Sequence, residues 1–278
     1  MKKILFFALS SLLFACQSPS QDTKETDQNL KDSTEQVVML QENKDSSEEV
    51  KDFSVQKVTF PAPDSLLVTA NLFHKGSAFP IIVLCHQAGS SKDEYNDIAK
   101  KLWKMGFNCL ALDQRSGGDR LGGNNETANL AVEKGITALS YLDAEQDMLA
   151  GIEYANQKYG KEVILVGSSY SAALALKVAE ENDKVKAVAS FSPGEYYKEQ
   201  GKTFISDAMK GLTKPVFLTS SKDEAPQAEL FYKIAESEIK VHYIPEVQGI
   251  HGARALWDST EGTEGYWEAF KNFLNQVK

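Results

Sequence analysis

The stretch "EVILVGSSYSAALAL" at residues 162–176 contains the sharpest predicted corner of the chain. It begins as an apolar run, breaks at a glycine and two serines, and resumes with an alanine–leucine pattern that is typical of a helix. A tight turn from strand to helix needs small residues two positions before and after its apex, because the backbones nearly touch there. Only Ser169 meets this condition, with Gly167 before it and Ser171 after it. We therefore expect Ser169 to stand at the apex of the turn.

Further apolar runs predict the sheet to which this corner belongs. Continuous runs of this kind are typical of strands that are buried on both faces. They are "IIVLC" (81–85), "NCLAL" (108–112), "EVILV" (162–166), "VKAVASF" (185–191), "PVFLTS" (215–220) and "KVHYI" (240–244). Before them, "VQKVTF" and "LLVTANLF" alternate apolar and polar residues around "PAPDS", which predicts an antiparallel hairpin.

Helical periodicity separates the runs, in residues 95–102, 144–159, 172–179 and 266–277. Ser91 and Glu94 predict a capping box before the first of these helices. The alternation predicts an α/β fold, with a mostly parallel central sheet, an N-terminal antiparallel hairpin, and helices on both faces. Sheets of this kind carry their sites at the carboxyl ends of the strands, and Ser169 follows one such end.

The segment "GSSYS" (167–171) resembles the GxSxG nucleophile elbow of the α/β-hydrolase superfamily, which points a serine hydroxyl into the site. Ser171 replaces the last glycine of that motif. The resemblance covers essentially residues 53–278 and implies that Ser169 is a nucleophile. Taken alone, so short a motif also fits a phosphate-binding or capping turn.

A serine nucleophile needs a base that takes its proton and an acid that orients the base. The resemblance implies the order serine, acid, histidine along the chain. Asp223 follows the run at 215–220, and His251 lies in the loop after the run at 240–244. We expect His251 as the base and Asp223 as the acid, with Glu224 as the alternative because Asp223 is nearer the strand end. A solvated loop histidine is the competing interpretation of His251.

The segment "VLCHQAGSSKDEY" (83–95) resembles the superfamily turn that supplies one oxyanion-hole donor. The resemblance implies the backbone N–H groups of Ala88 and Tyr170 as the two donors. With Gln87 in place of glycine, "HQAG" is similar to the dienelactone-hydrolase-like branch, which often uses a cysteine nucleophile. Because this chain has serine at that position, the resemblance implies hydrolysis of carboxylic esters rather than activity on dienelactones.

The connection at residues 192–214 has room for about one short helix and cannot hold a lid domain. We therefore expect an open site that accepts small esters. The expected substrate-binding residues are Gln87, Tyr196 and Tyr197, with Tyr170 and Trp257 as further walls, although core packing explains Trp257 equally well. The glycine-rich segment at 117–125 is expected as a mobile wall or as a plain surface loop.

No metal or cofactor is expected, because no histidine, cysteine or carboxylate cluster has ligand spacing. Cys85 ends one predicted strand and Cys109 begins its neighbour, so their thiols should lie toward opposite ends of the sheet. We expect both to be buried as small apolar side chains rather than joined by a disulfide.

The first residues, "MKKILFFALSSLLFAC" (1–16), have the basic start and the apolar stretch of a secretory signal. Their ending resembles the lipobox of bacterial lipoproteins, which implies that Cys16 is lipidated and anchors the protein to a membrane of the bacterial cell envelope. An ordinary secretory signal is the alternative. Residues 17–52 are polar and are expected to form a disordered acidic tether to the domain at 53–278.

The formal net charge of −9 is concentrated in that tether, where ten acids face four lysines. The signal contributes two positive charges, so five negative charges remain on residues 53–278. A mildly acidic domain without a basic stripe argues against nucleic-acid binding. We expect a serine esterase; the alternatives are a peptidase or thioesterase of the same fold, or a non-catalytic binding lipoprotein.

Overall fold

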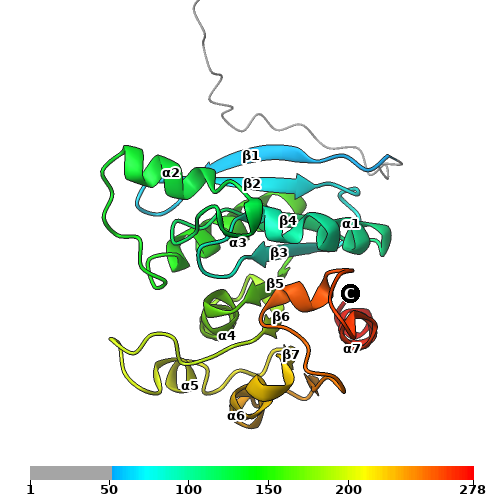
Figure 1. Cartoon of the computed structure of the whole chain (residues 1–278). Coiled ribbons are helices and arrows are strands. Elements are labelled where there is room, and N and C mark those ends of the chain that lie inside the picture. Colours follow the sequence, from blue (N-terminus) through cyan, green and yellow to red (C-terminus); the bar gives the residue numbers. More distant parts are fainter. Residues whose placement is uncertain (1–51) are drawn as a thin grey trace, which may run out of the picture. The chain divides into compact units, whose positions relative to one another are not determined.

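The computed structural model describes residues 52–278. The predicted signal with Cys16, and the tether up to residue 51, lie outside the described residues. In the described part, eight strands form one sheet in the order β1-β2-β4-β3-β5-β6-β7-β8 (Figure 1). The strands are β1 (Gln56–Pro61), β2 (Leu67–Phe73), β3 (Ile81–Cys85), β4 (Asn108–Leu112), β5 (Val163–Ser168), β6 (Val185–Phe191), β7 (Val216–Thr219) and β8 (Lys240–Tyr243).

The pairing of the strands confirms the expected fold class. Strand β2 pairs antiparallel with both β1 and β4, while every pair from β4 through β8 is parallel. All residues of β3, β4 and β5 are buried, because helices cover both faces of the central sheet. Strand β8 lies at the edge of the sheet and is only half-buried.

Helices pack on both faces of the sheet (Figure 1). One apolar core contains residues of α3 (Glu145–Tyr159), α4 (Tyr170–Glu181) and α6 (Ala225–Ile234). The other core contains residues of α1 (Asn96–Lys104) and α7 (Thr263–Val277). Two shorter helices, α2 (Glu126–Glu133) and α5 (Phe204–Ala208), complete this part of the chain.

The expected capping box before α1 does not form. The hydroxyl of Ser91 accepts a hydrogen bond from the Asp93 N–H instead, at 3.2 Å. The side chain of Glu94 is directed away from the cap and binds the N–H of Gln87. The short 3-10 helix η1 (Lys92–Tyr95) precedes α1, so the residue spacing of an α-helical cap is not present.

The connection between β6 and β7 contains a single helix, α5, of five residues. The carboxylate of Glu195 accepts hydrogen bonds from the N–H groups of Ile205 and Ser206, at 2.9 and 2.8 Å, and so satisfies the start of α5. This segment is as short as the sequence predicts, and it forms no separate lid domain.

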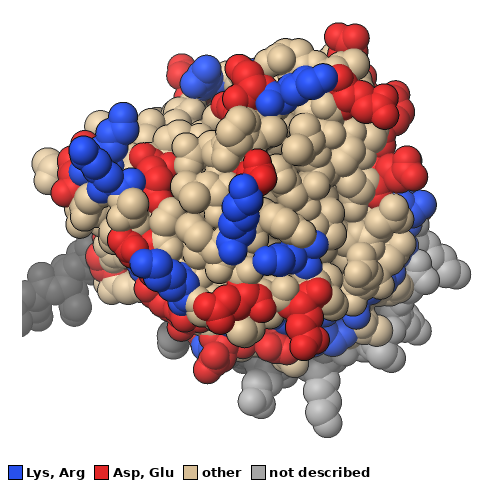
Figure 2. Space-filling model, turned by 90° about the horizontal axis from the view of Figure 1, so that it is seen from below, with Lys and Arg blue, Asp and Glu red and all other residues tan. Residues whose placement is uncertain are grey.

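The two cysteines of the sheet also lie as expected. Cys85 stands opposite Leu112 and Cys109 stands opposite Ile82, so the two thiols occupy opposite ends of the β3–β4 pair. Both thiols are buried and free. Among residues 52–278, no helix has the length and apolar character needed to cross a membrane. On the side shown in Figure 2, basic and acidic side chains are interspersed, without a continuous basic patch.

Candidate active site

The corner between β5 and α4 places Ser169 in a strained backbone conformation. Ser169 has φ 60° and ψ −123°, values that few residues other than glycine adopt. A side chain at Gly167 would lie 2.3 Å from the carbonyl oxygen of Ser171 and 2.6 Å from the Cα of Ala172, so only glycine fits there. Ser169 lies at the apex, as expected, and is 8% exposed.

An acid and a base meet at the carboxyl ends of the neighbouring strands. The Nδ1 atom of His251 lies 2.6 Å from Oε1 of Glu224, and the Ser192 hydroxyl donates to Oε2 of Glu224 at 2.7 Å. Burial raises the pKa of Glu224, but the hydrogen bonds from His251 and Ser192 outweigh it and lower that pKa to about 2. The ionised carboxylate keeps the proton of a neutral His251 on Nδ1, so Nε2 can accept a proton.

The structure corrects the expected acid. Oδ1 of Asp223 accepts hydrogen bonds from the Ser221 hydroxyl at 2.8 Å and from the Gln248 amide at 2.7 Å. Asp223 and Glu224 are consecutive in the 3-10 helix η3 (Lys222–Glu224), so their side chains point in different directions. Of these two acids, Glu224 is the one whose carboxylate contacts the imidazole of His251.

The loop of His251 is fastened directly to the elbow. The Gly252 N–H donates to Ser192 Oγ at 2.9 Å, and the Ala253 N–H donates to Ser168 Oγ at 2.9 Å. A side chain at Gly252 would lie 2.6 Å from Ser168 Oγ, so the approach of the two segments requires glycine. The loop that carries His251 is thereby held beside Ser168, the residue that precedes Ser169.

Two backbone donors flank the same corner. Ala88 occupies the turn that follows β3, in which the Ser90 N–H binds the Gln87 carbonyl at 3.2 Å. Tyr170 is the first residue of α4, where N–H groups have no acceptor inside the helix. In the described part of the chain, neither N–H donates to a backbone carbonyl in the turns and loops. Both can therefore bind a developing oxyanion.

The model of the dienelactone hydrolase family matches residues 68–277. The chain belongs to the dienelactone hydrolase family. It is therefore a hydrolase with the α/β-hydrolase fold, in which a serine stands at the elbow. A search of curated protein sequences finds no match.

Solved structures of similar fold include an esterase of Pyrococcus furiosus, with 17% identity, a TM-score of 0.60, and coverage of 81% of this chain and 93% of that one. A dienelactone hydrolase of Anabaena variabilis has 15% identity, a TM-score of 0.62, and coverage of 81% and 98%. An acylaminoacyl peptidase of Pyrococcus horikoshii has 17% identity, a TM-score of 0.61, and coverage of 82% of this chain but 42% of its own. Identities this low show the shared fold.

In this member of the dienelactone hydrolase family, one of the predicted substrate-binding residues, Tyr196, lies next to Ser169. The others, Gln87 and Tyr197, are buried. Tyr196 adjoins Ser169, and burial raises the pKa of its hydroxyl to about 12 although the Ser169 hydroxyl opposes this shift. Tyr197 lies in the core, where its hydroxyl binds the Tyr170 carbonyl at 2.9 Å, so the structure does not place it on the site. The Gln87 side chain is buried, and the backbone N–H of Gln87 donates a hydrogen bond to the carboxylate of Glu94. The Tyr170 side chain is also buried and forms no wall of the site.

The glycine-rich segment packs against the turn that contains Ala88. Its Gly118 and Arg120 N–H groups donate to the carbonyls of Ser90 and Gly89, each at 2.9 Å. A side chain at Gly117 would lie 2.3 Å from the Ser90 carbonyl oxygen, so the contact needs glycine. The segment thus supports the turn that contains Ala88.

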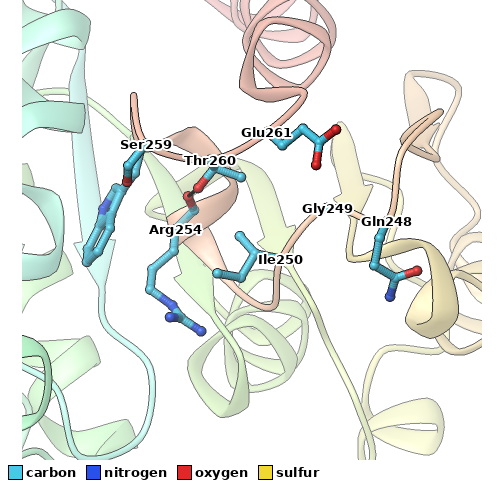
Figure 3. A pocket seen from close by; sticks show the side chains of 8 residues that line it. Gln248, Gly249, Ile250, Arg254, Ser259, Thr260 and Glu261 are labelled. Atoms are coloured by element: carbon cyan, nitrogen blue, oxygen red, sulfur yellow. Dashed lines mark hydrogen bonds between the residues drawn. The ribbon is translucent and has the colours of Figure 1, made fainter.

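A pocket of about 310 Å³ adjoins the His251 loop. It is lined by Gln248, Gly249, Ile250, Arg254, Trp257, Ser259, Thr260 and Glu261. Figure 3 shows the Arg254 and Ile250 side chains close together, with Gln248 and Glu261 on the other side. Trp257 therefore lines a pocket, yet its indole N–H binds the Glu94 carbonyl at 2.9 Å, so it also anchors this loop.

Sequence reasoning missed Ser192 and Ser168 as parts of the site. Ser192 has φ 58°, which is unusual for serine, and its hydroxyl lies between Glu224 and the Gly252 N–H. The available signal was positional, because Ser192 directly follows β6 at the same edge of the sheet as Ser169. The hydrogen-bond partners of this hydroxyl lie far away in the sequence, so its neighbours in the chain do not predict them.

Proposed function

We propose that this protein is a serine hydrolase that cleaves carboxylic esters of small substrates through an acyl-enzyme at Ser169. The observation that carries the proposal is the 2.6 Å hydrogen bond between Glu224 and His251, in a loop that is fastened to the elbow of Ser169. A nucleophile, a base and an orienting acid are the groups that acyl transfer needs.

The reaction follows from these positions. Nε2 of His251 takes the proton of the Ser169 hydroxyl while Oγ attacks the ester carbonyl carbon. The carbonyl oxygen becomes an oxyanion, which the N–H groups of Ala88 and Tyr170 stabilise. Glu224 stabilises the imidazolium that forms. The imidazolium then protonates the leaving alkoxide, and an ester of Ser169 remains.

Deacylation uses the same groups in the same order. A water molecule gives one proton to His251 and attacks the acyl carbon with its oxygen. The second tetrahedral intermediate collapses, Ser169 Oγ leaves, and the imidazolium returns the proton to it. The products are a carboxylic acid and the regenerated serine, with Glu224 ionised throughout.

The proposed preference for small esters rests on the solvent exposure of the acid and the base, and on the absence of a lid from the connection between β6 and β7. The side chains of His251 and Glu224 are 31% and 33% exposed, and the connection that holds lids in bulky-substrate relatives carries only the short helix α5. Among the predicted aromatic residues, the Tyr196 hydroxyl interacts with the hydroxyl of Ser169.

Two further parts of the proposal concern linkage type and location. Because the same groups cleave peptides and thioesters, and one neighbour of similar fold is an acylaminoacyl peptidase, the substrate test includes those linkages. From the sequence of residues 1–16, we propose lipidation at Cys16 and attachment to a membrane of the bacterial cell envelope.

The experiment is covalent labelling of the protein with a fluorophosphonate probe, followed by assays on aryl esters, thioesters and peptides. We expect labelling at Ser169, its loss in Ser169→Ala, and its severe slowing in His251→Ala. Ser140→Ala is the matched control, because among residues 52–278 this exposed loop serine binds only Asp143. Full turnover by Ser169→Ala would refute the mechanism, and an unlabelled wild type would favour a non-catalytic role.

A further inference from the structure

Glu94 is a buried acid that the proposed mechanism does not use. It is 3% exposed, and burial raises the pKa of its carboxyl group. Within residues 52–278, no lysine, arginine or histidine forms an ion pair with it. A buried carboxyl group without a cation is costly, so its position calls for a physical reason.

The two oxygens of Glu94 bind two different segments of the site. Oε2 accepts a hydrogen bond from the Gln87 N–H at 2.9 Å, and Oε1 accepts one from the Ser168 hydroxyl at 2.7 Å. Gln87 directly precedes the donor Ala88, and Ser168 directly precedes Ser169. One side chain therefore fixes the oxyanion turn relative to the nucleophile.

The same residue also reaches the loop of the base. Ser168 Oγ, which donates to Glu94, accepts the Ala253 N–H at 2.9 Å. The backbone carbonyl of Glu94 accepts the indole N–H of Trp257 at 2.9 Å. Ala253 and Trp257 both follow His251 in one short segment. Three separate parts of the chain thus converge on Glu94.

This convergence has consequences for the chemistry. Oxyanion stabilisation and attack by a serine depend on the positions of donor and nucleophile to within a fraction of an ångström. An apolar residue at position 94 could fill the volume, but it would leave the Gln87 N–H and the Ser168 hydroxyl without their acceptor. A carboxylate accepts from both donors at once, through two oxygens at a fixed separation.

We propose that Glu94 is a positioning residue, which holds the oxyanion turn, the nucleophile elbow and the base loop in register for catalysis. The inference rests on the proposed function, because it assumes that Ser169 reacts. Glu94 does not touch the substrate; it acts through Gln87 and Ser168.

The test compares Glu94→Gln and Glu94→Ala with the wild type, by the second-order rate of fluorophosphonate labelling and by kcat and KM on an aryl acetate. We expect labelling and kcat to fall about tenfold in Glu94→Gln, which keeps one acceptor, and about a hundredfold in Glu94→Ala. KM should change less than about threefold, since no substrate contact is removed.

Asn108→Ala is the matched control for lost stability. The Asn108 side chain is also buried and accepts hydrogen bonds from two backbone N–H groups, those of Lys75 and Gly76, but it lies at the amino end of β4, opposite the site. This variant should lose thermal stability, as we also expect for Glu94→Ala, while its labelling rate stays within about twofold of the wild type.

The outcomes separate the two proposals. If the wild type is labelled at Ser169 and Glu94→Gln reacts at the wild-type rate, the role of Glu94 is wrong and the proposed function stands. Equal slowing in Asn108→Ala and Glu94→Ala would also overturn it, because general destabilisation would then explain both. If the wild type is not labelled, both proposals fail. Should Glu94→Ala not fold, Glu94→Gln decides the question.

Discussion

The choice between two adjacent acids gives a sharp test of the site. Glu224→Gln keeps the volume of the side chain but leaves one oxygen where two are used, by His251 and by Ser192. One of these two donors must then face an NH₂ group. If the imidazole turns its unprotonated Nδ1 toward that group, Nε2 carries the proton and cannot accept one from Ser169.

The size of the effect follows from the exposure of the pair. In a fully buried triad, replacing the acid by its amide lowers kcat by about 10⁴. Here the acid and base are 33% and 31% exposed, so solvent screens part of the lost charge. We therefore expect kcat to fall by about 10² to 10³, with little change in KM.

Asp223→Asn is the matched control, because its carboxylate binds only Ser221 and Gln248 among the described residues. It should retain kcat within about twofold. Both variants are compared on an aryl acetate near pH 8, where an ordinary imidazole is neutral. A larger loss in Asp223→Asn than in Glu224→Gln would show that the assignment of the acid from this geometry is wrong.

Further predictions concern stability, backbone space, substrate size and the N-terminal segment. Burial lowers the pKa of His86 from 6.5 to about 4. As the pH falls, the imidazole is therefore protonated in the unfolded state before it is protonated in the folded state. The stability that neutral His86 provides should be complete above pH 6.5 and lost as the pH falls toward 4. Urea unfolding of wild type and His86→Gln should reveal a difference that shrinks by about 3 kcal/mol over this range, and an unchanged difference would contradict the shift. Gly167→Ala should lower both the melting temperature and the labelling of Ser169, because its Cβ would lie 2.3 Å from a backbone oxygen, and a wild-type melting temperature would refute this. Across aryl esters, kcat/KM should peak at acetyl to butyryl chains without interfacial activation, whereas a steady rise to dodecanoyl esters would contradict an open site. Cys16→Ser should move the protein from the membrane fraction or leave its precursor uncleaved, and unchanged attachment would exclude lipidation at Cys16.

The strands and the elbow could be predicted because both depend on short-range patterns. The runs at β3 to β8 are continuous and apolar, and Gly167 and Ser171 flank Ser169 at the spacing that a tight turn needs. Helices α2 and α6 were missed because their buried faces are small. Helix α6 buries only Ala225, Ala228 and Phe231, so its helical period is weak.

The acid could not be chosen from the sequence because Asp223 and Glu224 are consecutive. The directions of their side chains depend on the local turn of η3. They also depend on Gln248, which lies 25 residues further along and donates a hydrogen bond to Asp223. The same limit applies to Glu94, which the sequence suggested as a helix cap. Its partner Ser168 is 74 residues away, and no local pattern reports such a contact.

The two backbone hydrogen bonds that fasten the His251 loop bear on hydrogen exchange. Surface loops usually exchange their amide hydrogens through small local openings. The amides of Gly252 and Ala253, however, donate to Ser192 and Ser168, which end or directly follow central strands of the sheet. Releasing them requires the loop to separate from β5 and β6. These two amides should therefore exchange as slowly as the strands themselves, which would make the His251 loop part of the same cooperative folding unit as the sheet.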